Sequence, residues 1–125
     1  DMAQPSALVR LPEPKEAENR KVIEYLEAHY CQKISHEDLG RAFPVSTRHL
    51  SRRFKRDLQI TIFEYLRLYR TLMAIIELRT TTKRVTEVAY SCGYESMSSF
   101  YSDFSRVFSR PPRLMRDENS FSNLE

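Results

Sequence analysis

Basic side chains are concentrated in one short stretch of the chain, residues 46–56, which contains no acidic residue. These side chains are Arg48, Arg52, Arg53, Lys55 and Arg56, with His49 among them. An arginine can donate two hydrogen bonds to O6 and N7 of guanine, which is worth about 1–3 kcal/mol of base discrimination. Lysine and arginine also bind phosphate oxygens. The chemistry that this stretch can perform is therefore recognition of nucleic acid.

The same stretch has the pattern of a helix with one buried face. Leu50, Phe54 and Leu58 recur every four residues, and Ser46 before them is a good N-cap. The residues predicted to face outward and contact DNA are Ser46, Thr47, Arg48, Ser51, Arg52 and Lys55. Arg48 and Arg52 lie one turn apart and suit base contacts, whereas Arg53, Lys55 and Arg56 suit phosphates. The alternative for each arginine is a solvated charge, or an ion pair with an acid such as Asp57.

A second helix precedes this one at the spacing of a helix-turn-helix. Ser35 is a candidate N-cap with Asp38 three residues later, and Leu39 and Phe43 follow on the inward face. Pro44-Val45 then interrupts the helix, which leaves a turn of about three residues before the basic helix. The sequence therefore predicts that the basic helix is the outer, recognition helix of such a unit.

The pattern of this unit recurs in the second half of the chain. Val88-Ala89 corresponds to Leu39-Gly40, Gly93-Tyr94 to Pro44-Val45, and Phe100, Phe104 and Phe108 to Leu50, Phe54 and Leu58, with one extra residue in the second turn. The small residues Gly40 and Ala89 would let the two helices of each unit approach closely. Two halves with matched spacing favour a pair of helix-turn-helix units over two unrelated helical hairpins.

The second outward face is far less basic than the first. Its predicted DNA-contacting residues are Ser96, Met97, Ser98, Ser99 and Ser102. Serine hydroxyls bond to phosphates or bases, and Met97 suits a thymine methyl group. Since none of these five residues is a lysine or arginine, we expect the first unit to dominate affinity.

A helix over residues 62–79 links the two units, and apolar residues cover most of its circumference. Such a helix is expected to be buried on several sides. Its length of roughly 27 Å falls short of the roughly 34 Å between successive major grooves, which predicts bent DNA or one weakly engaged unit. Arg70 lies inside this helix and is expected to be structural, with Glu87 or Asp103 as its partner.

Length and composition fit one all-α domain of about seven helices. The expected divisions are an arm at residues 1–17, the paired units at 18–116 (first unit about 18–60, second about 82–116) and a polar tail at 117–125. The two cysteines, Cys31 and Cys92, are expected in the core, with no disulfide, metal site or cofactor. Neither a signal peptide nor a membrane span is evident, which favours the cytoplasm, and a first residue other than Met indicates a piece of a longer protein.

The residues of these elements resemble the DNA-binding domain of the AraC/XylS family of bacterial transcription regulators over about residues 20–116. The matching positions are Leu39, Val45-Ser46, Leu50, Arg52, Phe54, Tyr65, Arg70, Ala74, Leu78, Val85, Val88-Ala89, Gly93-Tyr94, Ser98, Phe100, Phe104, Pro112 and Arg116. The chain departs from the family at Ile62, where proline is frequent, near Ser109, where glycine is frequent, and at Met115, where an aromatic residue is usual.

The resemblance implies a sequence-specific transcription regulator, an activator, that inserts two recognition helices into adjacent major grooves of double-stranded promoter DNA. It implies RNA polymerase as a partner and a separate N-terminal effector or dimerisation domain. The alternative is a helical protein-interaction module that has lost DNA binding. An enzyme is not expected, because neither cysteine has the Pro-Cys-His context of the DNA-repair methyltransferases that carry a similar helical domain.

Overall fold

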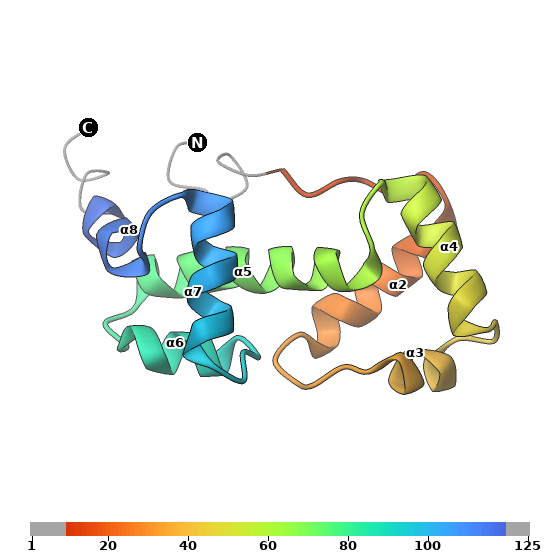
Figure 1. The fold of residues 1–125 in the computed structure, drawn as a ribbon, viewed down its shortest axis with the longest axis horizontal. Coiled ribbons are helices and arrows are strands. Elements are labelled where there is room, and N and C mark those ends of the chain that lie inside the picture. Colours follow the sequence, from red (N-terminus) through yellow and green to blue (C-terminus); the bar gives the residue numbers. More distant parts are fainter. Residues whose placement is uncertain (1–9, 120–125) are drawn as a thin grey trace.

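The computed structural model describes residues 10–119, and within them the chain forms seven helices and no strand. In chain order these are α2 (Ala17–His29), α3 (His36–Ala42), α4 (Thr47–Leu58), α5 (Ile62–Thr80), α6 (Val85–Ser91), α7 (Met97–Phe108) and α8 (Pro112–Asn119) (Figure 1). The all-α prediction is confirmed. Helix α8 ends at Asn119 and therefore includes the first three residues of the expected tail, which was predicted at 117–125.

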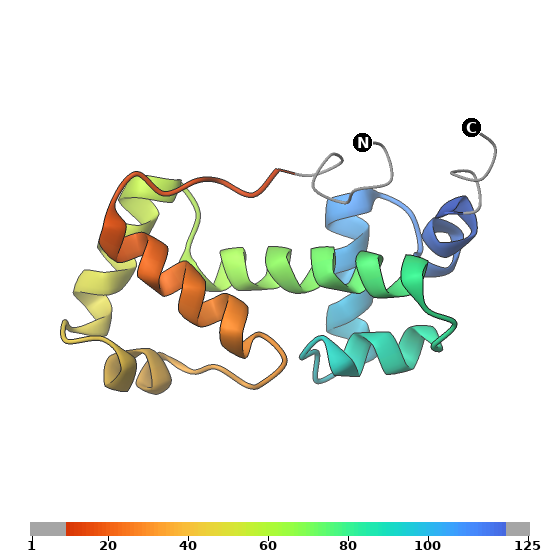
Figure 2. The same cartoon turned by 180° about the vertical axis from the view of Figure 1, so that it is seen from behind.

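The long helix α5 runs along the length of the molecule, and the other helices gather at its two ends. One group is α2, α3 and α4, and the other is α6, α7 and α8 (Figures 1 and 2). In both groups the outer helix, α4 or α7, crosses the direction of α5 and runs the same way, from the edge occupied by α3 and α6 to the opposite edge (Figure 1). The two candidate recognition helices are therefore parallel in sense.

The two helix-turn-helix units share lengths and caps. The inner helices α3 and α6 have 7 residues each, and the outer helices α4 and α7 have 12 residues each. A serine N-cap precedes each outer helix, since Ser46 Oγ accepts a hydrogen bond from His49 N and Ser96 Oγ accepts one from Ser99 N, both at 3.1 Å. A C-cap residue with left-handed backbone follows each helix, Gln59 with φ 68° and Ser109 with φ 60°. The predicted internal repeat is therefore present in the backbone.

Two hydrophobic cores lie at the two ends of α5. Leu50, Phe54 and Leu58 of α4 are buried in the first core, together with the apolar face of α2 and the beginning of α5. Phe100 and Phe104 of α7 are buried in the second core, and Phe108 packs against it half-buried. Because α5 contributes to both cores, burial of its side chains fixes the two units relative to each other.

The linking helix α5 is buried on several sides, as expected, because its residues belong to both cores, although Ile76 is 37% exposed. One expectation about burial was wrong. Cys31 is exposed because it follows the end of α2, where the chain turns away from the core, whereas Cys92 is buried as expected. Burial raises the pKa of the Cys92 thiol to about 12, which keeps this thiol protonated and unreactive at neutral pH.

Arg70 joins the two units, but not through the expected acids. Its Nε donates to the carbonyl oxygen of Tyr30 and its Nη2 to that of Gln32, both at 2.8 Å. Gly93 lies at the same junction with φ +96°, and a Cβ there would collide with the Tyr30 carbonyl oxygen and approach Arg70 Nε to 2.8 Å. The structural role predicted for Arg70 holds, while Glu87 instead accepts a hydrogen bond from Arg84 N.

Candidate nucleic-acid interface

The basic residues of α4 lie on its outward face. Ser46, Arg48, Arg52 and Lys55 are exposed, and Thr47 and Ser51 are half-buried. A Cβ on Gly40 of α3 would lie 3.3 Å from the Thr47 methyl group, so the inner and outer helices are in close contact at this point. The structure thus brings the six predicted residues of the first unit together on one helix, with Thr47 and Ser51 at the margins of its exposed face.

Neither Arg48 nor Arg52 forms a hydrogen bond or an ion pair with any residue in the described part of the chain. The alternative of an ion pair with Asp57 is contradicted, because that carboxylate binds the start of α2. It accepts hydrogen bonds from the backbone N–H groups of Lys15 and Glu16 and from Asn19 Nδ2 at 2.9–3.1 Å. The hydrogen bond from Asn19 and those from the backbone lower the pKa of Asp57. Both arginines are therefore available to an external acceptor.

The predicted residues of α7 divide into a buried edge and an exposed face. Ser96 is the N-cap, and Met97 is half-buried against the second core. Ser98, Ser99 and Ser102 are exposed. The structure therefore leaves three of the five predicted side chains exposed, and the only polar group of each is a hydroxyl.

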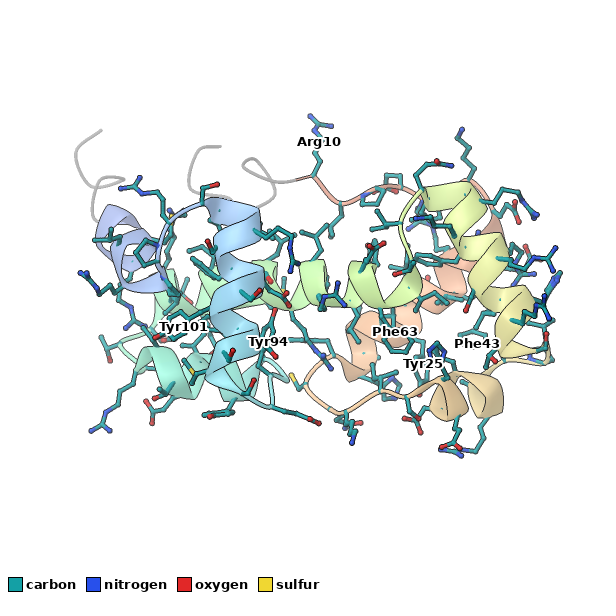
Figure 3. The ribbon with its side chains drawn as sticks, in the orientation of Figure 1. Arg10, Tyr25, Phe43, Phe63, Tyr94 and Tyr101 are labelled. Carbon is teal, nitrogen blue, oxygen red and sulfur yellow. The ribbon has the colours of Figure 1, made fainter. Side chains whose placement is uncertain are left out.

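The repeat identifies two further positions on this face that the sequence analysis missed. Matching Leu50 to Phe100 places Tyr101 at the position of Ser51 and Ser105 at the position of Lys55. Tyr101, which is labelled in Figure 3, is 47% exposed, and the centroid of its ring lies 5.7 Å from that of Phe100. Extending the register of the repeat by one residue beyond the buried phenylalanine is enough to find Tyr101.

A buried polar network fixes α7 on α5. Tyr94 Oη donates to Asp103 Oδ2 and is hydrogen-bonded to Thr71 Oγ1, both at 2.9 Å. Asp103 Oδ1 lies 3.1 Å from Arg106 Nη1 and 3.7 Å from Arg67 Nε. Burial raises the pKa of the Tyr94 hydroxyl, so this group remains a neutral donor. The network takes the place of an ion pair with Arg70 and sets the orientation of the exposed serines.

The part of the chain that the structure describes contains no cluster of three or more histidine, cysteine, aspartate or glutamate side chains able to hold a metal ion. In the same residues, no helix has the length and apolar character needed to cross a membrane.

Two helix-turn-helix units on one long helix, with parallel outer helices, define a double helix-turn-helix domain. Residues 39–118 match the family model described as a helix-turn-helix domain. The chain is 34% identical over 111 residues to the HTH-type transcriptional activator RhaS of Enterobacter sp. (strain 638), covering 89% of this chain and 40% of that protein. It is 30% identical over 100 residues to the xylose operon regulatory protein of Escherichia coli K12, covering 80% of this chain and 26% of that protein.

A solved structure with the same fold is the AraC-type DNA-binding transcriptional regulator from Chromobacterium violaceum. It superposes with a TM-score of 0.77 at 26% identity, over 82% of this chain and 92% of that chain. The chain therefore belongs to the AraC-type helix-turn-helix family of DNA-binding transcription regulators. It spans less than half the length of the curated relatives described above.

Proposed function

We propose that this chain is the DNA-binding module of a bacterial transcription activator, with α4 as its main reader of bases and α7 as a weaker second contact. The observation that carries the proposal is the pair of arginines on α4, Arg48 and Arg52, exposed one turn apart and without a partner among the described residues. Guanine edges in the major groove match the donors of an arginine. Ser46, Thr47 and Ser51 lie beside them, and Lys55 suits a flanking phosphate.

The arrangement of α4 and α7 suits two grooves on one side of a duplex. Both helices run in the same sense and lie at opposite ends of α5 (Figure 1). The 19 residues of α5 span about 28 Å, some 6 Å less than the roughly 34 Å between successive major grooves. If the spacing of α4 and α7 follows the length of α5, simultaneous entry of both helices bends the DNA toward the protein, at an energy cost that the added contacts offset.

The remaining partners in the proposal follow from the relatives. RhaS is a transcriptional activator and is much longer than this chain, which supports RNA polymerase as a partner and an additional effector or dimerisation domain. The proposed role is regulatory rather than enzymatic, on promoter DNA in the bacterial cytoplasm.

A salt titration of DNA binding tests the proposal. Binding to DNA fragments from upstream of the neighbouring genes is measured by mobility shift at salt concentrations from about 50 to about 200 mM. The affinity should fall steeply over this range, by about 10³- to 10⁵-fold if the protein makes 6–10 phosphate contacts. A sequence-specific complex should also survive competition by random DNA. Binding that is absent or insensitive to salt would instead favour a protein-interaction module.

A further inference from the structure

A groove of about 590 Å³ lies between the two units, beside the candidate recognition face of α7. Its walls are the turn after α2, the middle of α5, the turn between α6 and α7, and the outward side of α7. Its charged lining consists of the cations Lys33, Arg67, Arg70 and Arg106 and the acids Glu95 and Asp103. The positive charges therefore outnumber the negative ones in a concave site that both units build.

The cations of this groove differ in how far they are already paired. Arg70 is bound to two backbone carbonyl oxygens, which are neutral and leave its charge in place. Arg67 and Arg106 share Asp103, whose side chain is only 6% exposed, yet their own side chains are 45% and 61% exposed. Lys33 is exposed and has no ion pair or hydrogen bond within the described residues. A surplus of positive charge therefore faces the solvent in the groove.

Hydroxyl groups complete the wall that α7 contributes. Ser98, Ser99 and Ser102 all line the groove and are all exposed. Cations and serine hydroxyls together form the donor set that proteins use for phosphate oxygens of a DNA backbone. Aromatic and apolar side chains, which suit a small organic ligand, are a minor part of this lining, at Tyr94 and Ile34.

We propose that this groove seats the DNA backbone where it crosses from one recognition helix to the other, with Lys33, Arg67 and Arg106 bound to phosphate oxygens. This inference rests on the proposed function, and it adds a binding site that no recognition helix provides alone. It explains how α7 could contribute affinity although its outward face carries serines. The cations beside these serines are Arg67 of α5, Lys33 of the turn after α2 and Arg106 near the end of α7. Phosphate contacts between the two grooves also favour the bend that the short α5 requires.

The test compares Lys33→Ala with Lys21→Ala, the latter replacing a lysine on α2 that is also exposed but lies outside the groove. Binding of each variant to a duplex carrying the full site is measured by fluorescence anisotropy as a function of salt. Loss of one phosphate contact should reduce the slope of log K against log salt by about 0.9 in Lys33→Ala and leave it unchanged in Lys21→Ala. The sequences selected from random DNA should stay the same, because no base contact is removed. Ethylation of the phosphates between the two half-sites should weaken Lys33→Ala less than the wild type, because the variant has already lost one of the three proposed contacts while Arg67 and Arg106 remain.

Two results would overturn the inference. The first is a wild-type slope and wild-type ethylation pattern in Lys33→Ala, while Arg48→Ala weakens binding to the same duplex; the proposed function then stands without the groove. The second is saturable binding of inorganic phosphate by the free domain at Ser98 and Ser102, seen by amide chemical shifts, with no effect of Lys33→Ala on DNA; the groove is then a site for a free anion. Failure of the proposed function is distinguishable, since Arg48→Ala would also leave DNA binding unchanged.

Discussion

The two helix-turn-helix units have the same backbone plan, but the outer helix of the first carries basic side chains where that of the second carries neutral hydroxyl groups. In α4 the outward positions 48, 52 and 55 hold Arg, Arg and Lys, and in α7 the matching positions 98, 102 and 105 hold three serines. The buried side chains also differ in size, since Leu50 of α4 is matched by the larger Phe100 of α7. The shared backbone plan places an exposed helix on each side of the molecule, and we expect the outward side chains of each helix to decide what it can bind.

The comparison also shows that the units are held by different means. The first unit is closed by Asp57 of α4, which caps the start of α2 across the unit. The second is closed by Asp103 of α7, which binds Tyr94, Arg106 and Arg67. The position of Asp103 holds Arg53 in the first unit, and the position of Asp57 holds Val107 in the second, so exchanging the two outer helices would break both networks.

The largest effect is expected from the double variant Arg48→Ala/Arg52→Ala. Two lost guanine contacts of about 1–3 kcal/mol each correspond to a fall in affinity of roughly 30-fold or more for the specific duplex. Circular dichroism should be unchanged, because both side chains are exposed and have no partner in the described residues. The matched change in the second unit, Ser98→Ala/Ser102→Ala, should cost much less. Equal losses in the two double variants would break the asymmetry drawn above.

The next largest effect is expected on stability, when alanine replaces the glycine of either half, Gly40 or Gly93. Gly93→Ala places a methyl group against the Tyr30 carbonyl oxygen at a positive φ, and it should lower the free energy of unfolding by more than about 2 kcal/mol. Gly40→Ala meets only the Thr47 methyl group at 3.3 Å and gains helix propensity, so its effect should be within about 1 kcal/mol. Urea unfolding of the two variants measures both values. A larger loss in Gly40→Ala would show that the inner helix of the first unit, and not the junction at Arg70, limits stability.

A smaller effect should separate phosphate contact from base contact. Lys55→Ala should reduce the salt slope of binding by about 0.9 and weaken binding to all sequences alike, whereas Ser105→Ala at the matching position should leave the slope unchanged. Anisotropy titrations on specific and random duplexes measure both quantities. A change of base preference in Lys55→Ala would show that Lys55 contacts a base and not a phosphate.

The smallest effect is expected at Tyr101. Its exposed ring suits contact with a thymine methyl group or a sugar, so Tyr101→Ala should cost about 1 kcal/mol, roughly five-fold in affinity. Tyr101→Phe should bind like the wild type if the ring makes the contact, and like Tyr101→Ala if the hydroxyl does. Wild-type affinity in both variants would leave the serines and the groove as the only contacts of the second unit.

Much of this architecture was predictable because it follows from local rules. Serine N-caps at Ser35 and Ser46 and apolar residues every four positions predicted the helices and their buried faces. The internal repeat and the exposure of Arg48 and Arg52 could be deduced in the same way. Whether the predicted residues contact DNA stays a prediction.

The features that could not be predicted from the sequence depend on tertiary contacts. Arg70 binds the carbonyl oxygens of Tyr30 and Gln32, and every residue has a carbonyl oxygen, so no residue type marks such a partner. The same holds for Asp57, which caps a helix far away in the sequence. Tyr101 was missed for a different reason: its counterpart Ser51 is polar, and an aromatic residue in a phenylalanine-rich stretch suggests core until the register is extended.

Selection of bound sequences from random duplex DNA tests the central claim most directly. If α4 and α7 enter adjacent grooves, the selected sequences should show two preferred stretches about 10–10.5 base pairs apart, a strong guanine-containing one lost in Arg48→Ala/Arg52→Ala and a weaker one changed in Tyr101→Ala. A single preferred stretch that survives the arginine substitutions, or no preference at all, would contradict the account.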